Sequence, residues 1–466
     1  MLDNRMAAAP GEGDESTRTV LPDIDPARVA RPRFAWADVP AYFRDPLGYL
    51  ARARRERGGF ARLPLGPVTP FLVSEPALIE HVLVTDNKSY MKDFFMQLLA
   101  NEAVGRGLLT SEGDFWRRQR RLAQPAFHRE RIAGYATTMI RCAERYADTL
   151  RPGQDRPLHR DMMELTLHIV AQTLFGDDEH IPTEEVGASL DVLMAHYADN
   201  LLLAFPALRS WPLPANLRFR KAVARLDQIL LSMIARRRGS HGRNDLLAML
   251  LSAQDEDGSR MTDRQLRDEV ITLFTAGHET TGLALSYAFF LLSQHPQAAA
   301  TLQGELRSVL GPERRLPTFA DVPALRFCEA VVSETLRLYP PAWIVGREAA
   351  VDTTLAGVAI PRGSQVWMSQ WVVHRDPALF PEPDQFRPER WLDGLQKRLP
   401  RFAYFPFGGG PRLCIGSSFA MVEATLVLAT LARRFAFRVT PKLPLALLPS
   451  ITLRPRDGLP ARIEAA

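Results

Sequence analysis

The sequence contains few cysteines and no secretory or membrane-anchoring apolar segment at its start. Only three of its 466 residues are cysteine, namely Cys142, Cys328 and Cys414. They are far apart and odd in number, which argues against a disulfide framework and favours a reducing cytoplasm. The remaining composition, with 46% hydrophobic and 24% charged residues, is that of an ordinary globular chain and excludes a disordered or fibrous protein.

Residues 1–33 are polar and rich in proline. A signal peptide needs about 7–15 apolar residues in a row and a membrane-spanning helix needs about 20. We therefore predict a mobile tail over residues 1–33, one domain over residues 34–466, and no membrane anchor. The most apolar internal stretch, Val270–Gln294, contains Glu279, which favours a buried helix over a membrane span.

A strong excess of one charge is also absent. The 58 basic residues exceed the 53 acidic residues by only five, and the arginines are scattered along the chain, so we do not expect a nucleic-acid partner. A chain of this length can enclose a large cofactor and still keep a hydrophobic core around it.

The spacing of apolar residues predicts a mainly α fold with a small β-rich lobe (α+β). Helical spacing dominates from about residue 94 to 340. One hairpin is predicted from Phe60–Leu65 and Phe71–Val73. A second is predicted from Thr353–Ile360 and Gln365–Trp371 across a Pro-x-Gly turn. Because the two hairpins are distant in the sequence, the lobe is built from separate segments.

A long helix is predicted between Thr262 and His295. Thr262 followed by Gln265 is a capping-box start, and His295 precedes a proline. About 33 residues at 1.5 Å each give a helix of roughly 50 Å. Gly277 and the threonines near the middle favour a local bulge, because glycine weakens a helix and a Thr hydroxyl can bond the carbonyl four residues back.

The most informative segment is a glycine-rich loop that ends at Cys414. It reads FPFGGGPRLCIG over residues 405–416, and an apolar helix is predicted after it, from Phe419 to Leu431. Glycine allows backbone N–H groups to approach the sulfur, and the start of a helix favours thiolate over thiol. A thiolate among amide donors suits an axial metal ligand. The alternative is a structural cysteine in a turn, which is our assignment for Cys142 and Cys328.

This loop resembles the haem-binding signature of the cytochrome P-450 family, F-x-x-G-x-R-x-C-x-G. The matching residues are Phe407, Gly410, Arg412, Cys414 and Gly416. The resemblance extends from about residue 34 to the end of the chain. It implies the cytochrome P-450 fold, with haem b (iron protoporphyrin IX) bound through Cys414.

Two further motifs of the family concern structure. Glu334 and Arg337 match E-x-x-R, and Arg390 matches P-E-R. By itself, the first pair is typical of an exposed ion pair one helical turn apart. The resemblance instead implies a buried triad of these three residues that shapes the fold around the haem loop.

A basic segment near residue 116 resembles the family's W-x-x-x-R motif. Trp116 and Arg120 lie one turn apart on one helix face, and an indole N–H and a guanidinium both donate to carboxylates. The resemblance implies that they bind the haem propionates, together with Arg412 and Arg347. The alternative, a solvated arginine-rich face, is our assignment for the neighbouring Arg117, Arg118 and Arg121.

Glu279 and Thr280 lie in a segment that resembles the family's [A/G]-G-x-[D/E]-T-[T/S] motif. The resemblance implies a proton relay with Glu279 as the acid and Thr280 as the alcohol, and the cleavage of dioxygen needs two protons. The alternative is a polar patch that satisfies its own hydrogen bonds in a helix bend. We assign the neighbouring His278 to packing or solvent access and not to iron ligation.

The resemblance places the substrate pocket under several separate apolar segments. Core packing is the alternative for every residue in them. No Arg or Lys in these segments is placed to bind a carboxylate, so we expect a small apolar substrate such as a fatty acid, terpenoid, steroid or polyketide-like compound. The implied contact residues are Phe94, Phe95, Met96, Phe274, Ala276, Ala342, Trp343, Ile344 and Ile451, with a lid within residues 194–205.

Together these matches imply a haem-thiolate monooxygenase that hydroxylates or epoxidises its substrate with one oxygen atom from O2. The chain ends 466 − 414 = 52 residues after Cys414, so we expect no fused reductase. Electrons are expected from NAD(P)H through a separate reductase and a ferredoxin or flavodoxin. We expect a cytoplasmic monomer. A haem-thiolate isomerase or peroxygenase and a non-turnover haem sensor are the alternatives, and the Glu279–Thr280 pair argues against a peroxygenase.

Overall fold

The chain folds into two units, each made of two separated stretches of sequence. Unit 1 comprises residues 1–95 and 329–417, and unit 2 comprises residues 96–328 and 418–466. The computed structural model describes residues 21–29, 38–66, 69–176, 181–199, 211–238, 245–254 and 258–466. Residues 1–20 and 30–33 of the predicted tail, and residues 200–205 of the predicted lid, lie outside these described residues.

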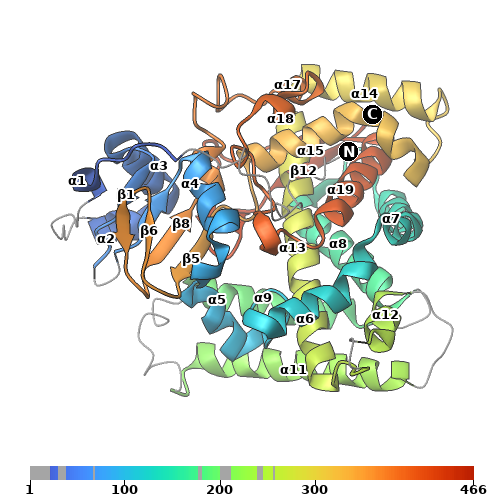
Figure 1. Ribbon diagram of the computed structural model, residues 1–466. Coiled ribbons are helices and arrows are strands. Elements are labelled where there is room, and N and C mark those ends of the chain that lie inside the picture. Colours follow the sequence, from blue (N-terminus) through green and yellow to red (C-terminus); the bar gives the residue numbers. More distant parts are fainter. Residues whose placement is uncertain are drawn as a thin grey trace. The chain divides into compact units, whose positions relative to one another are not determined.

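Unit 1 is the β-rich lobe. Figure 1 shows its blue N-terminal helices beside orange strands from much later in the sequence. Among the described residues, its main sheet has the strand order β1-β2-β8-β5-β3, in which β2 and β8 are parallel and the other neighbours are antiparallel. The elements are α1 (Pro26–Val29), α2 (Asp38–Arg44), α3 (Pro46–Arg57), β1 (Phe60–Arg62), β2 (Phe71–Val73), α4 (Pro76–Glu80), η3 (His81–Thr85), η4 (Asn87–Ser89), β3 (Tyr90–Lys92), β5 (Val345–Ala349), β6 (Thr353–Leu355), β7 (Val358–Ile360), β8 (Gln365–Met368), α16 (Gln370–Val373), α17 (Glu389–Leu392), α18 (Leu395–Arg398) and η9 (Gly410–Arg412).

The core of unit 1 includes part of the predicted tail. Val29 on α1 is only 2% exposed and belongs to the cluster that contains Phe71 and Val366 from the sheet. Leu21 and Ile24 pack against the same cluster. Residues 21–29 are therefore packed, because their apolar side chains find a hydrophobic surface that the sequence does not reveal.

Unit 2 is mainly helical and is organised around α13 (Asp263–Gln294), which packs most extensively on α8 (Leu158–Phe175). A sheet of order β4-β12-β9 and a hairpin of β10 and β11 complete it. Its other elements are η5 (Ala100–Val104), α6 (Gly113–Ala123), η6 (Gln124–Phe127), α7 (Arg129–Thr149), β4 (Asp155–Pro157), α9 (Thr183–Asp199), α11 (Pro214–Arg238), α12 (Leu246–Ser252), α14 (Pro296–Leu310), η8 (Phe319–Ala324), β9 (Phe435–Val439), β10 (Leu447–Pro449), β11 (Leu453–Pro455) and β12 (Pro460–Ala465). Helices α5 (Phe94–Leu99), α15 (Arg326–Leu338) and α19 (Ser417–Ala432) have residues in both units.

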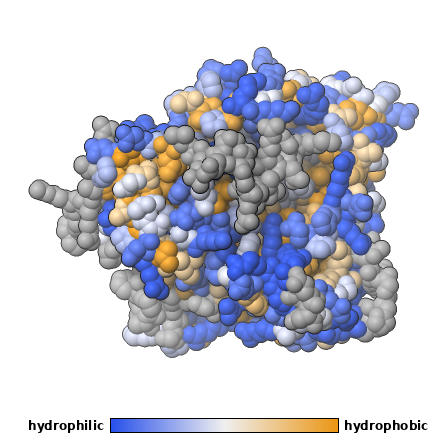
Figure 2. Space-filling model, viewed as in Figure 1, coloured by the Kyte–Doolittle hydropathy of each residue, from blue (hydrophilic) through white to orange (hydrophobic). Residues whose placement is uncertain are grey.

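The predicted long helix is confirmed, including its start. Thr262 caps α13 with a full capping box, since its hydroxyl accepts from the Gln265 N–H and the Gln265 side chain accepts from the Thr262 N–H. Most of the helix is buried. None of the helices in the described ranges has the length and hydropathy of a membrane span. The visible surface is dominated by hydrophilic side chains (Figure 2), as the composition predicts.

The mainly α fold with a small β-rich lobe is thus confirmed, and so is the first predicted hairpin, in which β1 pairs with β2. The second predicted hairpin is wrong. Thr353–Ile360 folds back on itself, because β6 pairs with β7 across Ala356 and Gly357, whose positive φ values of 46° and 77° suit a tight reversal. Strand β8 pairs instead with β2 and β5 and ends at Met368.

Candidate active site

The loop that ends at Cys414 is closed by backbone hydrogen bonds within unit 1. The Cys414 N–H donates to the Phe407 carbonyl oxygen over 3.0 Å, and the Leu413 N–H donates to the Gly410 carbonyl oxygen over 3.0 Å. Cys414 is exposed and lies three residues before α19 begins at Ser417. An exposed thiol at the start of a helix has the setting that favours a thiolate. This loop therefore fits the ligation of a haem iron by cysteine.

Steric crowding explains why position 410 is a glycine. Its φ is +66°, and a Cβ atom there would lie 2.0 Å from the Leu83 carbonyl oxygen in η3. Any larger residue would push the loop away from η3. The close approach of two backbones thus fixes the position of the loop in unit 1.

His374 holds the beginning of the loop. Its Nε2 atom accepts a hydrogen bond of 3.0 Å from the Phe405 N–H. Burial lowers the pKa of His374 well below its ordinary value, and the charges of Arg337 and Arg375 lower it further. A neutral imidazole can accept through Nε2, so His374 has a structural role in holding this loop.

Glu334, Arg337 and Arg390 lie together in a buried ion network. The side chains of Glu334 and Arg337 are both 0% exposed and are joined by two hydrogen bonds of 2.8 Å. Arg390 Nε lies 3.0 Å from Glu334 Oε1. The Trp391 indole N–H also donates to Glu334, over 2.9 Å, a partner that no motif in the sequence predicts. Burial lowers the pKa of Arg390, and the charge of Glu334 opposes this effect.

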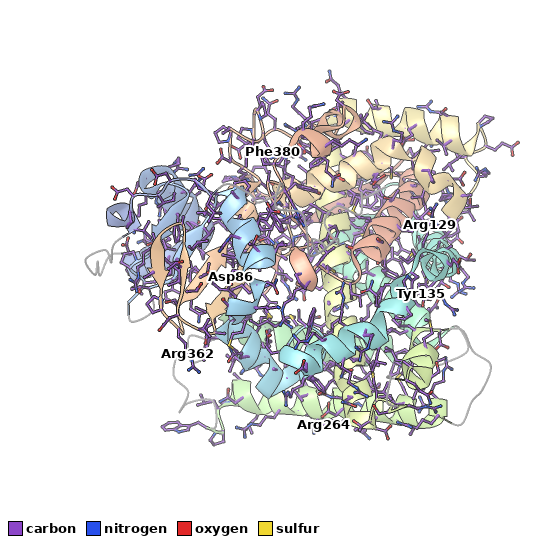
Figure 3. The ribbon with its side chains drawn as sticks, in the orientation of Figure 1. Asp86, Arg129, Tyr135, Arg264, Arg362 and Phe380 are labelled. Carbon is purple, nitrogen blue, oxygen red and sulfur yellow. The ribbon has the colours of Figure 1, made fainter. Side chains whose placement is uncertain are left out.

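Arg337 joins this network to the loop. It donates to the His374 carbonyl oxygen over 2.9 Å, and His374 in turn holds Phe405. The Arg337 guanidinium also lies 5.2 Å from the ring centre of Phe380, which Figure 3 labels. These contacts offset the cost of burying the charges. Through His374 they also fix Phe405, the first residue of the cysteine loop, relative to the network.

In unit 2, Glu279 and Thr280 are neighbours on α13 but differ in surroundings. The Thr280 hydroxyl donates to the Ala276 carbonyl oxygen over 2.7 Å, and Ala276 is exposed. Glu279 is only 1% exposed. Its Oε1 atom accepts from Arg454 Nε on β11 over 2.6 Å and also from the Thr452 hydroxyl.

The charge state of Glu279 follows from these partners. Burial raises the pKa of Glu279, but the charge of Arg454 and the hydrogen bonds from Arg454 and Thr452 outweigh it, so the pKa lies below its ordinary value. Glu279 is therefore a carboxylate near neutral pH. Binding of a proton would remove the charge that pairs with Arg454.

The predicted bulge near Gly277 is absent, because α13 is α-helical throughout. Close packing against α8 explains the glycine at position 282. A Cβ atom at Gly282 would lie 2.9 Å from Met163 Sδ and 3.0 Å from Thr166 Oγ1, both on α8. Buried His278 is fixed by the same contact surface, since the Thr166 hydroxyl donates to its carbonyl oxygen over 2.8 Å.

The predicted propionate donors occur in both units. Trp116 is buried and Arg120 is partly buried, one turn apart on α6 in unit 2. Arg412 lies in the cysteine loop of unit 1, and Arg347 lies on β5, where it donates to the Gly346 carbonyl oxygen over 2.8 Å. These side chains supply cationic and indole donors of the kind that bind carboxylates.

The predicted substrate residues fall into two groups. Phe274 is 1% exposed and stacks on Phe175 with ring centres 5.7 Å apart. Trp343 is also buried, and its carbonyl oxygen accepts from Ser369 over 2.9 Å. The others are exposed or partly exposed: Phe94, Phe95, Met96, Ala276, Ala342, Ile344 and Ile451.

The two remaining cysteines are packed inside unit 2. Cys142 Sγ lies 3.0 Å from Gln172 Oε1, and Cys328 Sγ lies 3.3 Å from the Thr425 carbonyl oxygen. Both are buried and free of disulfides. Their surroundings are those of structural cysteines.

Known proteins resemble this chain over most of its length. A family model described as "Cytochrome P450" matches residues 41–457. Cyclooctatin synthase of Streptomyces melanosporofaciens is 40% identical over 88% of this chain and 89% of its own. Cyclooctat-9-en-7-ol 5-monooxygenase of the same organism is 35% identical over 86% and 87% of the two chains. Pentalenene oxygenase of Streptomyces avermitilis is 33% identical over 91% and 93%. The solved structure of the cytochrome P450DA haem domain matches with a TM-score of 0.83 and 27% identity, over 94% and 96% of the two chains.

Proposed function

This chain belongs to the cytochrome P450 family and is a monooxygenase that acts on an apolar substrate, and from that premise we propose that its substrate is a cyclic terpenoid. Three relatives that align with at least 86% of this chain are named for cyclooctatin, cyclooctat-9-en-7-ol and pentalenene. The small, exposed Ala276 beside Thr280 supports a bulky apolar substrate, since it takes up little space and offers no charge.

Membership of the family implies a haem cofactor and redox partners. When bound, haem supplies the iron centre at which dioxygen is activated. We assign Cys414 as the thiolate ligand, with Phe407, Gly410 and Gly416 shaping its loop. Trp116, Arg120, Arg347 and Arg412 are the proposed donors to the propionates, because their N–H groups pair with carboxylates.

We assign the supply of protons to Glu279 and Thr280. Thr280 presents a hydroxyl that is already aligned by its bond to the Ala276 carbonyl oxygen. Glu279 is charged and bonded to Arg454, so in this proposal it collects a proton when that bond loosens and passes it toward the Thr280 hydroxyl. The ion pair thereby limits when the buried carboxylate can take up a proton.

We further propose that one domain over residues 34–466 carries the reaction as a cytoplasmic monomer. The small number and wide spacing of the cysteines support a reducing compartment. Electrons come from NAD(P)H through a separate reductase and a ferredoxin or flavodoxin in this proposal. The exposed arginines of α6, such as Arg117, suit an acidic carrier protein.

The observation that supports haem-thiolate chemistry is the exposed Cys414 thiol in its glycine-rich loop. Reduced protein with carbon monoxide is expected to give the strongly red-displaced absorbance of a thiolate-bound adduct, and Cys414→Ser is expected to lose it. Buried Cys328→Ser is the matched control and keeps the band. A wild-type protein without the band contradicts thiolate ligation.

The substrate class needs its own experiment. We expect pentalenene and a fused-ring diterpene alcohol to shift the Soret band of the ferric protein to the blue, with palmitic acid and testosterone as size-matched comparisons. Binding of a terpenoid followed by its oxygenation with reductase and ferredoxin supports the proposal. Tighter binding and turnover of palmitic acid or testosterone contradicts the terpenoid assignment and leaves the monooxygenase activity standing.

A further inference from the structure

Three consecutive charged residues on α13 are buried. Arg267, Asp268 and Glu269 are 6%, 5% and 1% exposed, whereas Arg264 one turn earlier is exposed and labelled in Figure 3. Burial of three adjacent charges costs free energy unless each finds a partner. Their partners therefore indicate what this turn of α13 does.

Both carboxylates bind backbone N–H groups of one segment, residues 103–110. Asp268 Oδ2 accepts from the Arg106 N–H over 2.8 Å, and Glu269 Oε2 accepts from the Leu108 N–H over 3.1 Å. Hydrogen bonds from amides to ionised carboxylates are stronger than neutral ones. The 103–110 segment is thus attached to α13 at two points that are independent of its own side chains.

Arg267 binds the same segment through the opposite type of group. Its guanidinium donates to the carbonyl oxygens of Ala103 and Val104, each over 3.1 Å. It also pairs with Asp268 at 2.9 Å and with Asp227 on α11 at 2.6 Å. Arg267 is thereby neutralised and held in place while it fixes the start of the segment.

The segment also lies in direct contact with α13. A Cβ atom at Gly107 would be 2.3 Å from Thr272 Oγ1 and 2.4 Å from the Asp268 carbonyl oxygen. Residues four apart in a helix are neighbours on its surface, so Asp268, Thr272, Ala276 and Thr280 form a continuous row that turns gradually around α13. Ala276 begins about 6 Å beyond Thr272, at 1.5 Å per residue. The segment therefore covers the turn directly before Ala276.

We propose that Arg267, Asp268 and Glu269 are positioning residues that clamp the 103–110 segment onto α13 and thereby set the access of ligands to the face that carries Ala276 and Thr280. This inference rests on the proposed function, which places substrate and proton transfer on that face. The hydrogen bonds that Arg267, Asp268 and Glu269 make to this segment all go to its backbone groups, so the clamp fixes the path of the backbone. Release of the segment is expected to uncover the face from one end.

The first experiment measures the clamp without any need for haem. Arg106 is exposed and is a recognition residue for trypsin. Cleavage of the Arg106–Gly107 bond requires the segment to detach from α13, so the rate of cleavage measures that detachment. Asp268→Ala removes an attachment, and Gly107→Ala adds a methyl group where α13 leaves no room. Asp268→Ala is expected to speed this cut about tenfold, the effect of losing one hydrogen bond to a charged group. Gly107→Ala is expected to speed it by a similar factor, because its methyl group overpacks the contact with α13.

Asp263→Asn is the matched control on the same helix. Asp263 and its partner Arg238 are both exposed, at 58% and 47%. The hydrogen bond that Asp263 accepts in the described part of the chain comes from Arg238 and not from the 103–110 segment. The control is expected to leave the cutting rate unchanged. If Asp268→Ala does not yield folded protein, Asp268→Asn and Gly107→Ala still decide the question.

The second experiment measures access. Stopped-flow binding of 4-phenylimidazole to the ferric protein is expected to show association and dissociation rate constants that both rise about three- to tenfold in the two variants, with the Kd changed less than about twofold. An unchanged cutting rate in both variants overturns the clamp. Faster cutting with unchanged binding rates overturns the access role. A wild-type protein that binds no haem overturns the proposed function and the access role, while the cutting rates decide the clamp separately.

Discussion

Replacement of Arg454 by methionine tests the buried ion pair on α13. Arg454 Nε lies 2.6 Å from Glu279 Oε1, and the two side chains are 19% and 2% exposed. Methionine keeps much of the apolar volume but removes the charge that compensates the burial of Glu279. Burial then dominates, and the pKa of Glu279 is expected to rise above its ordinary value of 4.5.

Protonation limits how much the unpaired carboxyl of Glu279 can destabilise the variant. At pH 7, a carboxyl with an ordinary pKa of 4.5 escapes a buried charge by binding a proton, which costs about 1.36 × 2.5 ≈ 3.4 kcal/mol. Loss of one partner of a buried pair typically costs about 3–5 kcal/mol. Because Thr452 still donates to Glu279, we expect Arg454→Met to lower the free energy of unfolding by about 2–3 kcal/mol at pH 7.

The pH dependence distinguishes this explanation from a simple loss of packing. In the wild type, the lowered pKa of Glu279 gives stability that is present above pH 4.5 and is lost as the pH falls. In the variant, the raised pKa makes the folded protein less stable as the pH rises above 4.5. The difference between the two proteins is therefore expected to shrink from pH 7 toward pH 4.5.

Urea unfolding followed by tryptophan fluorescence at pH 5 and pH 7 measures these differences. Glu279→Gln/Arg454→Met removes both charges and is expected to recover most of the lost stability. Arg462→Met is the control, because Arg462 and Asp155 form an exposed pair of 57% and 80% exposure that contributes little. A loss below about 0.5 kcal/mol at pH 7, within the range of an ordinary surface substitution, refutes the reasoning. So does a double variant as unstable as Arg454→Met.

Three further predictions follow from the same contacts. Gly282→Ala is expected to lower the free energy of unfolding in urea by about 1–3 kcal/mol, because its methyl group meets Met163. Gly304→Ala, whose methyl group meets nothing within 4 Å, is expected to raise it by about 0.5–1 kcal/mol. Equal effects of the two substitutions contradict the packing argument. Because burial lowers the pKa of His374, the imidazole in the unfolded chain binds a proton at a higher pH than the imidazole in the folded protein. The free energy of unfolding is therefore expected to fall as the pH drops below about 6.5. If it falls equally steeply between pH 7 and 5 in a His374→Gln variant, His374 is not the cause. Thr280→Ala is expected to retain haem and substrate binding but to release a larger share of the consumed electrons as hydrogen peroxide, and an unchanged ratio of product to NAD(P)H consumed removes Thr280 from the relay.

Local sequence signals predicted several elements well. The capping box at Thr262 and the proline after His295 bound α13 within a residue of its observed ends, because both signals act on hydrogen bonds within the same turn. The glycine-rich segment before Cys414 indicated a tight loop, and the loop observed is closed by bonds between residues no more than seven apart. Such features depend on neighbours in the chain.

Other features depended on distant partners and escaped prediction. The Arg454 partner of Glu279 lies 175 residues away, and nothing in the sequence pairs the two. Gly277 and its neighbours favoured a bulge because a helix considered alone is weakened by glycine, but α13 remains regular where α8 packs closely against it. The stacking of Phe274 on Phe175 likewise joins residues that are far apart in the sequence.

By itself, the order of amino acids determined where the long helix starts, where the thiol loop turns and which family the chain resembles. Each of these depends on a few adjacent residues whose backbone conformations are linked by short-range bonds and by side-chain size. The folded chain alone decided which charges are buried and what they hold, as with Glu279 on β11 or Arg267 and Asp268 on the 103–110 segment. The cost of burying a charge depends on groups brought near it from elsewhere, and only the packing of the helices brings them there.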